Sequence, residues 1–300
     1  MTTTHVTVLK KEAVEGLSLR PEAIIVDATL GAGGHARDIL SQLNSDGMLI
    51  ALDADESAIE ALEGELKGDA TVHLITANFR TLDSVLTKLD VPHVDGVLAD
   101  LGWRMEQFAG GGKGFSFQHD EPLTMTFGNP TDEDSYPFTA KDIINEWSEE
   151  SIANVLKGYG EERFAKRIAR KIVEERESAP IETSGQLVEI ISSAVPGFYR
   201  TGKTHPATRS FQALRIAVND ELASLEEFIQ VAVQHLSPNG RLAIITFHSI
   251  EDRIVKHTFR TLAAEHGMTI ITKKPVTASK EELAENPRAR SAKLRIIQKN

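Results

Sequence analysis

The sequence predicts an α/β fold organised around a parallel sheet, and three observations near its start support this. Two short apolar runs, at residues 24–26 and 48–52, are typical of strands buried on both faces. A glycine-rich turn at Gly31, Gly33 and Gly34 follows the first run and leads into a helix-like segment. The second run ends at Asp53. This order is typical of a nucleoside-binding half-domain, in which the acidic residue accepts hydrogen bonds from the ribose hydroxyls.

The glycine spacing distinguishes two classes of nucleoside cofactor. Dinucleotide-binding folds use G-x-G-x-x-G and place the pyrophosphate on the helix N-terminus. Here Gly31 and Gly33 supply G-x-G, but no third glycine follows at that spacing. S-adenosylmethionine carries no pyrophosphate, so the pattern favours a methyltransferase over a nicotinamide enzyme. A glycine turn that only connects a strand to a helix remains the structural alternative.

Composition restricts the class of protein further. The 300 residues are enough for one large domain with an insertion or for two domains. The absence of cysteine excludes disulfides and cysteine-based zinc sites. With a net charge of −11, any RNA contact has to come from local basic patches. The first residues lack the features of a signal peptide, and no apolar run reaches the ~20 residues that span a bilayer. We therefore expect a cytoplasmic protein with no membrane partner.

Three more apolar runs, at residues 72–76, 94–99 and 241–247, extend the predicted sheet, and two closing strands are expected at 268–272 and 293–297. Ligands of open parallel sheets bind beyond the carboxyl ends of the strands. Residues near four such ends are polar or aromatic, and we expect them to face one crevice: His35, Asp53, Phe79 and Asp100.

The strand–helix alternation stops after the fourth run. Residues 108–137 predict a long loop at the mouth of the crevice, and helical patterns follow at 140–147, 149–157, 161–178 and 184–194. A further helix is expected over 207–236. The predicted organisation is a discontinuous sheet domain, residues 1–108 and 207–300, with an inserted loop and all-helical subdomain at 109–206.

Three basic stretches stand out in this acidic chain. Such stretches either contact phosphates or form solvated faces paired with glutamates, and both interpretations stay open. The candidate RNA-binding residues are Arg163 and Arg167 on one helix, Arg209 and Arg215 beyond His205, and Arg288 and Arg290 near the C-terminus.

Several motifs together resemble the bacterial 16S rRNA cytosine-N4 methyltransferase family (MraW/RsmH type). They span nearly the whole chain, and the longer ones are specific to that family. The matching segments are GGH at 33–35, YGEERFA at 159–165, HPATRSFQALR at 205–215, VNDEL at 218–222, FHSIEDR at 247–253 and NPRARS at 286–291.

The resemblance implies a class I, Rossmann-like methyltransferase sheet with an inserted helical subdomain that helps to grip ribosomal RNA. It implies S-adenosylmethionine as the cofactor and N4 of a cytidine in the decoding centre of 16S rRNA, within the small ribosomal subunit, as the target. A homodimer is one assembly that the sequence allows. The implied cofactor contacts are Gly33, Gly34, His35, Asp53, Phe79, Asp100 and Gln107. Of these, Asp53 would hold the ribose, Phe79 would lie beside the adenine, and the backbone of residues 33–35 would meet the methionine end.

The chain departs from the family pattern near the expected chemistry. Residues 103–107 read WRMEQ where the family usually has VSSPQ. Thr124, Thr126 and Gly128 stand where the family usually has an acid, an arginine and a second acid. These departures concern the loop expected to meet the target base and leave the cofactor motifs in place.

The target amine is a poor nucleophile, because its lone pair is delocalised into the ring. The base must be unpaired and the amine aligned with the sulfonium methyl group. We hypothesise that Asp100 positions the amine or the cofactor, that Trp103 stacks on the base, and that His248 lines the base pocket. Loop packing for Trp103 and a structural hydrogen bond for His248 are the alternatives. The histidines show no ligand spacing, so we expect no metal.

Two rival functions follow from the same features. One is a methyltransferase of another substrate, whose basic stretches would be neutralised by glutamates. The other is a ribosome-assembly or RNA-binding factor that keeps the cofactor pocket without turnover. The departures from the family pattern at Thr124 and Thr126 are the reason to consider the second rival, a factor without catalytic turnover.

Overall fold

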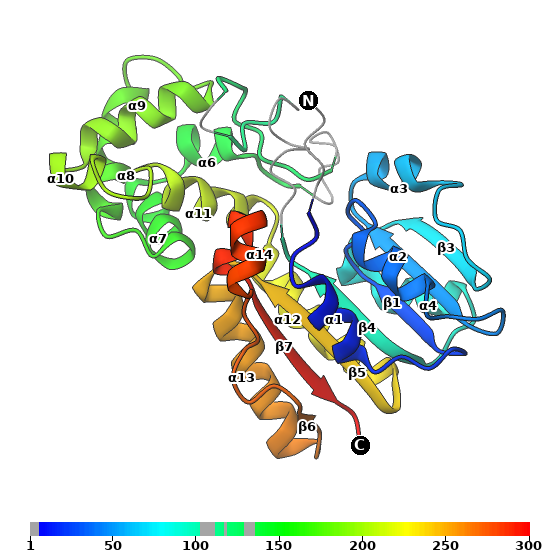
Figure 1. Ribbon diagram of the computed structural model, residues 1–300. Coiled ribbons are helices and arrows are strands. Elements are labelled where there is room, and N and C mark those ends of the chain that lie inside the picture. The colour runs from blue at the N-terminus through cyan, green and yellow to red at the C-terminus, as the bar shows by residue number, and fades with distance from the viewer. Residues whose placement is uncertain (1–5, 103–111, 117–118, 129–135) are drawn as a thin grey trace. The chain divides into compact units, whose positions relative to one another are not determined.

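The computed structural model describes residues 6–102, 112–116, 119–128 and 136–300 of the chain. It contains two compact units, shown together in Figure 1. We call residues 1–102 and 222–300 the sheet unit, and residues 103–221 the helical unit.

The sheet unit contains a seven-stranded sheet in the order β3-β2-β1-β4-β5-β7-β6 (Figure 1). Strands β1 to β5 run parallel, and β7 pairs antiparallel with both β5 and β6. The strands are β1 (Ile24–Asp27), β2 (Met48–Asp53), β3 (Thr71–Thr76), β4 (Val94–Asp100), β5 (Leu236–Thr246), β6 (Thr269–Ile270) and β7 (Lys293–Gln298).

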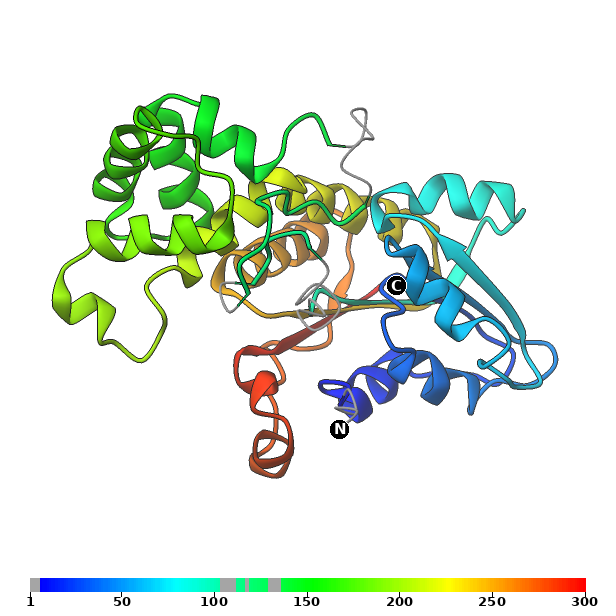
Figure 2. The same ribbon diagram turned by 90° about the horizontal axis from the view of Figure 1, so that it is seen from above.

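Helices cover both faces of this sheet. Buried side chains of α4, α12 and α13 form one core with the sheet, and those of α1, α2 and α3 form a second core on the other face. Figure 2 shows the yellow and orange helices on the opposite side of the sheet from the blue ones. The helices are α1 (Lys10–Leu17), α2 (Gly34–Leu40), α3 (Glu56–Leu62), η1 (Phe79–Thr81), α4 (Leu82–Lys88), α12 (Glu221–His235), α13 (Ser249–Glu265), α14 (Lys280–Glu285) and η2 (Pro287–Ser291).

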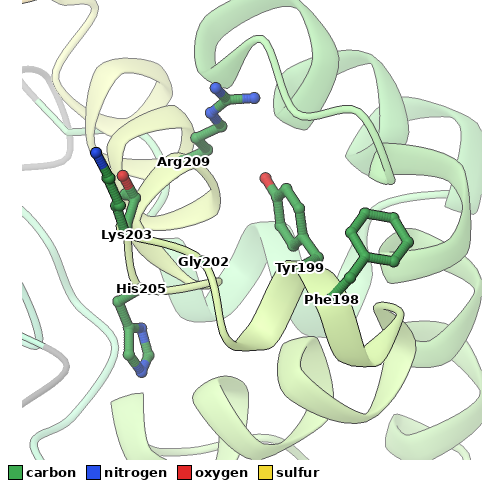
Figure 3. Close-up of a pocket in the computed structure, with 7 residues that line it drawn as sticks. Phe198, Tyr199, Gly202, Lys203, His205 and Arg209 are labelled. Carbon is green, nitrogen blue, oxygen red and sulfur yellow. The ribbon is translucent and has the colours of Figure 1, made fainter.

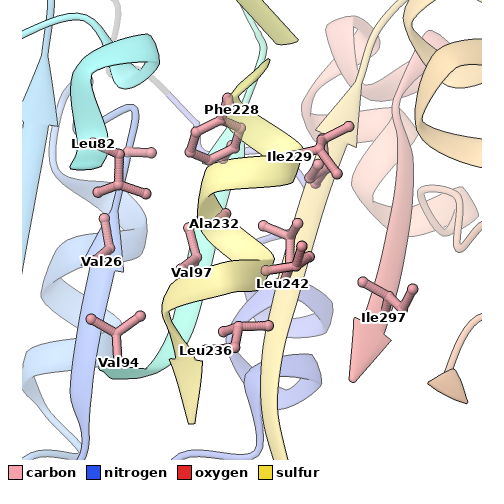
Figure 4. Packing of buried hydrophobic residues seen from close by; sticks show 14 of the residues in the cluster. Val26, Leu82, Val94, Val97, Phe228, Ile229, Ala232, Leu236, Leu242 and Ile297 are labelled. Carbon is pink, nitrogen blue, oxygen red and sulfur yellow. The ribbon is translucent and has the colours of Figure 1, made fainter. Parts of the chain in front are cut away.

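The first core explains why the central strands are continuous apolar runs. Val26 on β1, Val97 on β4 and Leu242 on β5 are fully buried, and Phe228 and Ala232 of α12 pack on them (Figure 4). A parallel strand covered on both faces has no solvent side, so polar residues are confined to its ends. The polar strand ends therefore collect at one edge of the sheet.

The helical unit has its own hydrophobic core. Threonine N-caps with reciprocal side chains begin two of its helices: Thr139 with Asp142 and Thr183 with Gln186. Its helices are α6 (Ala140–Glu146), α7 (Glu149–Gly160), α8 (Ala165–Arg176), α9 (Ser184–Ala194), α10 (Gly197–Arg200) and α11 (Thr208–Val218).

The structure differs from the sequence prediction over residues 207–236. The single helix expected there is two helices, α11 and α12, because the backbone turns left-handed at Asp220 (φ 45°). Helix α11 packs against α7, so residues 207–221 fall in the helical unit rather than with the sheet. Helix α14 and the turn η2 were not expected. Among the helices of the described residues, none is long and apolar enough to cross a membrane.

Candidate active site

Three aspartates meet at the carboxyl ends of neighbouring strands. Asp27 ends β1, Asp53 ends β2 and Asp100 ends β4, and β1 lies between the other two strands. The carboxylates of Asp100 and Asp53 are close enough to raise the pKa of Asp27 by repulsion. The sequence prediction that Asp53 and Asp100 share one edge is therefore consistent with the strand order.

Asp53 is oriented by the glycine turn. Its Oδ2 accepts a hydrogen bond from the backbone N–H of Gly31 at 2.8 Å, and its Oδ1 accepts one from the N–H of Asp55 at 3.0 Å. Gly31 has a positive φ of 59°, which a residue with a Cβ rarely adopts. The turn therefore fixes the orientation of the Asp53 carboxylate at the end of β2.

Gly33 and Gly34 are required by the protein's own packing. Gly33 has a φ of 73°, and a Cβ on it would lie 2.8 Å from Leu62 Cδ1. A Cβ on Gly34 would lie 1.7 Å from Oγ1 of Thr7. The N-terminal segment therefore passes directly over the start of α2, a packing reason for glycine that the sequence argument, based on ligand approach, did not include.

His35 is buried under that N-terminal segment, with 4% of its surface exposed. Its Nε2 lies 3.2 Å from the carbonyl oxygen of Val8, which can only accept, so Nε2 carries a proton. Its Nδ1 lies 3.9 Å from Oδ2 of Asp100. That distance is too long for a hydrogen bond but brings the imidazole within electrostatic reach of the carboxyl group.

Asp100 is held at the end of β4 by backbone contacts. Its Oδ1 accepts from the N–H of Gly102 at 2.9 Å, and its own N–H donates to Oγ1 of Thr29 at 2.6 Å. Burial raises the pKa of Asp100 to about 7; the Gly102 N–H opposes the rise and the carboxylate of Glu251 adds to it. A carboxyl group with such a pKa can exchange a proton near neutral pH.

Asp27 is a candidate that the sequence analysis did not select. It is fully buried, its Oδ1 accepts from the N–H of Thr29 at 3.2 Å, and no donor among the described residues reaches Oδ2. Burial, partly opposed by the Thr29 hydrogen bond, raises its pKa to about 7. A buried carboxylate oxygen without a partner is unfavourable unless a ligand satisfies it. The position of Asp27 directly before the glycine turn was the sequence feature that could have identified it as a site residue.

Phe79 lies just beyond β3, on the 3₁₀ turn η1. Its ring packs edge-to-face on Phe228, with the ring centroids 5.1 Å apart and the planes at 63°. The Asn78 side chain caps the turn by accepting from the N–H of Arg80 at 2.9 Å. These contacts fix the Phe79 ring, and its partly exposed surface remains available to an aromatic ligand.

His248 acts as the N-cap of α13. Its Nδ1 accepts from the N–H of Glu251 at 3.3 Å, and Glu251 Oε2 accepts from the N–H groups of Phe247 and His248 at 2.8 and 3.2 Å. His248 Nε2 lies 3.0 Å from Glu251 Oε1 but is not oriented to hydrogen-bond with it. The geometry gives His248 a structural role as a helix cap, and we assign it no catalytic role. Trp103 and Gln107 lie outside the described residues.

The predicted RNA-binding residues have different environments. Arg163, Arg167 and Arg209 of the helical unit are exposed, and Arg209 Nη1 donates to the carbonyl of Glu161 at 3.2 Å. Arg215 is mostly buried and forms a two-point ion pair with Glu221, at 2.8 and 3.0 Å. Its guanidinium therefore has a structural partner, and we leave it out of the proposed RNA contacts.

Arg288 and Arg290 lie on η2 of the sheet unit, and both side chains are exposed. The turn is fixed at its start, since Oδ1 of Asn286 accepts from the N–H of Arg288 at 3.2 Å. Asn286 in turn donates to the carbonyl oxygen of Val6 at 2.9 Å. The C-terminal basic stretch is thus attached to the N-terminal segment that covers His35.

In its described part, the loop that departs from the family pattern is held by hydrogen bonds between its own residues. Thr124 Oγ1 donates to the carbonyl of Lys113 at 3.1 Å, and Thr126 Oγ1 donates to the carbonyl of Gly128 at 3.2 Å. The N–H of Gly128 donates to the Tyr136 hydroxyl at 2.8 Å, and a Cβ there would lie 2.9 Å from the Tyr136 ring. Neutral hydrogen bonds therefore occupy positions where the family usually has charges.

The sheet order, with five parallel strands and an antiparallel β7, together with acidic and aromatic residues at the carboxyl ends, defines a class I S-adenosylmethionine-dependent methyltransferase. The sequence profile of the MraW methylase family matches residues 2–300. The chain belongs to this family.

Relatives named ribosomal RNA small subunit methyltransferase H are similar along almost the whole chain. The protein from Paenibacillus sp. (strain JDR-2) is 43% identical over 317 residues, covering 98% of this chain and 99% of the relative. The one from Symbiobacterium thermophilum is 46% identical over 312 residues, covering 98% and 96%. The family resemblance, the fold class and the S-adenosylmethionine cofactor predicted from the sequence are confirmed.

Among solved structures, an rRNA methylase from Streptococcus thermophilus aligns with 99% coverage of both chains, a TM-score of 0.44 and 12% identity. NSun6 from Pyrococcus horikoshii with SFG covers 98% of this chain and 53% of that chain, with a TM-score of 0.44 and 15% identity.

Proposed function

We propose that this protein transfers the methyl group of S-adenosylmethionine to N4 of a cytidine in the decoding centre of 16S rRNA. The observation that carries the proposal is the 43% and 46% identity, over 98% of the chain, to relatives named ribosomal RNA small subunit methyltransferase H. The substrate is the small ribosomal subunit or its RNA, and the reaction takes place in the cytoplasm, where that substrate resides.

The sheet unit supplies a contact for each part of the cofactor. Asp53 accepts hydrogen bonds from the ribose hydroxyls, and Phe79 packs beside the adenine. The backbone of residues 33–35 meets the methionine end, where Oδ2 of Asp27 is a buried acceptor for the cationic amino group. The fit rests on this unpartnered oxygen and on the fixed orientation of Asp53. When bound, the cofactor supplies an electrophilic methyl group on a sulfonium.

Asp100 receives the target amine. Its carboxylate accepts a hydrogen bond from the N4 amino group, which orients the amine and increases electron density on its nitrogen. After transfer the nitrogen has to lose one proton, and a carboxylate with a pKa of about 7 can accept it. The backbone N–H of Gly102 and the hydroxyl of Thr29 hold Asp100 in position for this role.

Transfer of label from S-adenosylmethionine to different acceptors tests the substrate class. Small ribosomal subunits that lack the modification, free 16S rRNA, transfer RNA and small-subunit proteins are offered separately. We expect label only with the small subunit or its RNA. Label in protein alone would contradict the proposal and support a methyltransferase of another substrate.

A second candidate is an RNA-binding assembly factor without turnover. The observation that favours it is the replacement of charged family residues by Thr124, Thr126 and Gly128, with neutral hydrogen bonds at these positions. This candidate predicts cofactor binding and binding to small subunits without transfer of label. A Thr124→Asp, Thr126→Arg double variant that gains activity would support it.

A further inference from the structure

The most exposed large apolar side chain of the described residues is Phe198, on the four-residue helix α10 of the helical unit. Its exposed fraction is 67%, compared with 46% for Val6 and 38% for Ile271. A ring that remains this accessible adds little hydrophobic stabilisation to the fold, because that stabilisation grows with the area removed from water. A binding role is therefore the better explanation for its position.

The Phe198 ring rests on a fixed aromatic base. Phe164 lies edge-on to it, with centroids 6.3 Å apart, and Tyr199 packs on Phe164 at 5.0 Å. The Tyr199 hydroxyl donates to Oε2 of Glu162 at 2.8 Å, and Oε1 of Glu162 accepts from the N–H of Phe164 at 2.8 Å. Glu162 is only 2% exposed. One buried carboxylate thus fixes the Tyr199 side chain and the backbone at Phe164.

Cations surround this aromatic base. The guanidinium carbons of Arg163 and Arg167 each lie 5.9 Å from the Phe164 ring centroid. Lys203 and Arg209 line a cavity of about 190 Å³ together with Phe198 (Figure 3). Within the described part of the chain, none of these four cations forms an ion pair with a carboxylate.

Helix α8, which carries Arg167, also carries two cations that do form ion pairs, and they provide a comparison. Arg170 of α8 lies 3.7 Å from Glu149, and Lys171 lies 2.6 Å from Glu175. The protein as a whole is acidic, with a net charge of −11, so carboxylates are abundant. Among the residues that the structure describes, the cations beside this exposed ring nonetheless have no carboxylate partner, which favours an external anionic ligand that also carries aromatic groups.

We propose that this surface, made of Phe198, Arg163, Arg167, Lys203 and Arg209, binds an unpaired segment of RNA. A base stacks on Phe198 and the cations contact the flanking phosphates. Single strands expose base faces and phosphates together, whereas a duplex hides the base faces in its stack. The inference rests on the proposed function, because it assigns part of the RNA substrate to the helical unit. Glu162 is a positioning residue that acts through Tyr199 and Phe164.

A Phe198→Trp variant gives a direct readout of stacking. Its fluorescence is measured against that of the unsubstituted protein, which has two tryptophans of its own. We expect quenching by single-stranded RNA of roughly 4–16 nucleotides, the usual site size of such surfaces, and much weaker quenching by the same sequence in a duplex. Equal quenching by both forms, or quenching by an acidic peptide but not by RNA, would overturn the proposal.

Binding of the same oligonucleotides to side-chain variants tests the role of the ring. Phe198→Ala is expected to weaken binding about 5- to 150-fold, the effect of losing one stacked base. Phe198→Trp should restore binding and Phe198→Leu should not, since an aromatic face is required. Ile271→Ala, at an exposed apolar residue of the sheet unit, is the matched control and should leave binding unchanged. Full binding by Phe198→Ala would contradict the proposal.

Salt dependence tests the cations separately. Replacing Arg163 or Arg209 by Gln should reduce the slope of log Kd against log salt by about 0.7, the value for one phosphate contact on a single strand. Arg170→Gln is the control, because Arg170 is already close to Glu149. Unchanged slopes for both Arg163→Gln and Arg209→Gln would remove the cations from the proposal.

These measurements do not require catalysis, so they distinguish this inference from the proposed function. Phe198-dependent binding of single strands without any methyl transfer would refute the function and leave the surface supported. Normal methyl transfer by Phe198→Ala, with an unchanged KM for small subunits and unchanged RNA binding, would refute the surface and leave the function supported.

Discussion

Asp53 and Gly31 are joined by a hydrogen bond of 2.8 Å between the carboxylate Oδ2 and the backbone N–H. This contact ties the end of β2 to the glycine turn after β1, so the residue proposed to bind the ribose also fixes the turn proposed to contact the methionine end of the cofactor. The two halves of the proposed cofactor site are therefore mechanically linked.

Replacing Asp53 by Ala should weaken the binding of S-adenosylmethionine by about 10- to 150-fold, because hydrogen bonds to a charged group are worth about 1.5–3 kcal/mol. Asp53→Asn keeps one oxygen acceptor and should weaken binding less. Isothermal titration calorimetry measures both. Equal, unchanged affinities for the two variants would show that Asp53 does not hold the cofactor.

The rate of methyl transfer should rise with pH through about 7, because Asp100 accepts a proton or hydrogen bond only when ionised and its pKa is raised to about 7. Asp100→Asn should lower the single-turnover rate about 100-fold and abolish this rise. Asp27 also has a raised pKa of about 7, so Asp27→Asn is the necessary comparison. If Asp27→Asn alone flattens the profile, the titrating group is Asp27 and the role assigned to Asp100 is wrong.

Asp27 should make the fold less stable as pH rises, because burial raises its pKa from 3.8 to about 7. The native state then holds the proton more tightly than the unfolded state, so the contribution of this group is complete below pH ~4 and is lost by pH ~7. Asp27→Asn should raise Tm at pH 8 by at least about 2–4 °C, the change that 1 kcal/mol produces in a domain of this size.

Thermal unfolding without ligand at pH 5 and pH 8 measures this effect, with Asp69→Asn at an exposed acid as the control. We expect Asp27→Asn to raise Tm at pH 8 but not at pH 5. Loss of stability at pH 8 would show that the ionised carboxylate is favourable where it lies.

Gly34→Ala should destabilise the sheet unit by roughly 1–3 kcal/mol or more, as overpacking does in a close-packed interior. The added Cβ would lie 1.7 Å from Oγ1 and 2.8 Å from Cβ of Thr7. Thr7→Gly should recover part of the loss in a double-mutant cycle followed by urea unfolding. Gly158→Ala, where nothing lies within 4 Å of the new Cβ, is the control and should be neutral or slightly stabilising. No coupling between residues 7 and 34 would contradict the packing described here.

The sheet could be predicted from sequence because its central strands are apolar on both faces, as at β1 and β4. The break between α11 and α12 could not, because the apolar spacing continues across it and only the left-handed backbone of Asp220 interrupts the helix. The extent of the helical unit was missed for the same reason. Local pattern determines where a helix forms, but packing of α11 on α7 determines to which unit it belongs.

Among the site residues, too, some could be predicted from local sequence pattern and others depend on three-dimensional packing. Asp53, Phe79 and Asp100 could be selected because each lies at or just beyond the carboxyl end of a strand, and these ends share an edge of the sheet. Asp27 also lies at the end of a strand, but its importance depends on complete burial and on an oxygen without a donor among the described residues, which no local sequence pattern indicates. The ion pair of Arg215 with Glu221, six residues apart across a helix break, was likewise hidden.

The central claim is tested most directly by nucleoside mass spectrometry of 16S rRNA after incubation of unmethylated small subunits with the protein and S-adenosylmethionine. We expect N4-methylcytidine, formed by the unsubstituted protein and about 100-fold more slowly by Asp100→Asn. Methylation of a different atom or base, or no methylated nucleoside despite cofactor binding, would contradict it.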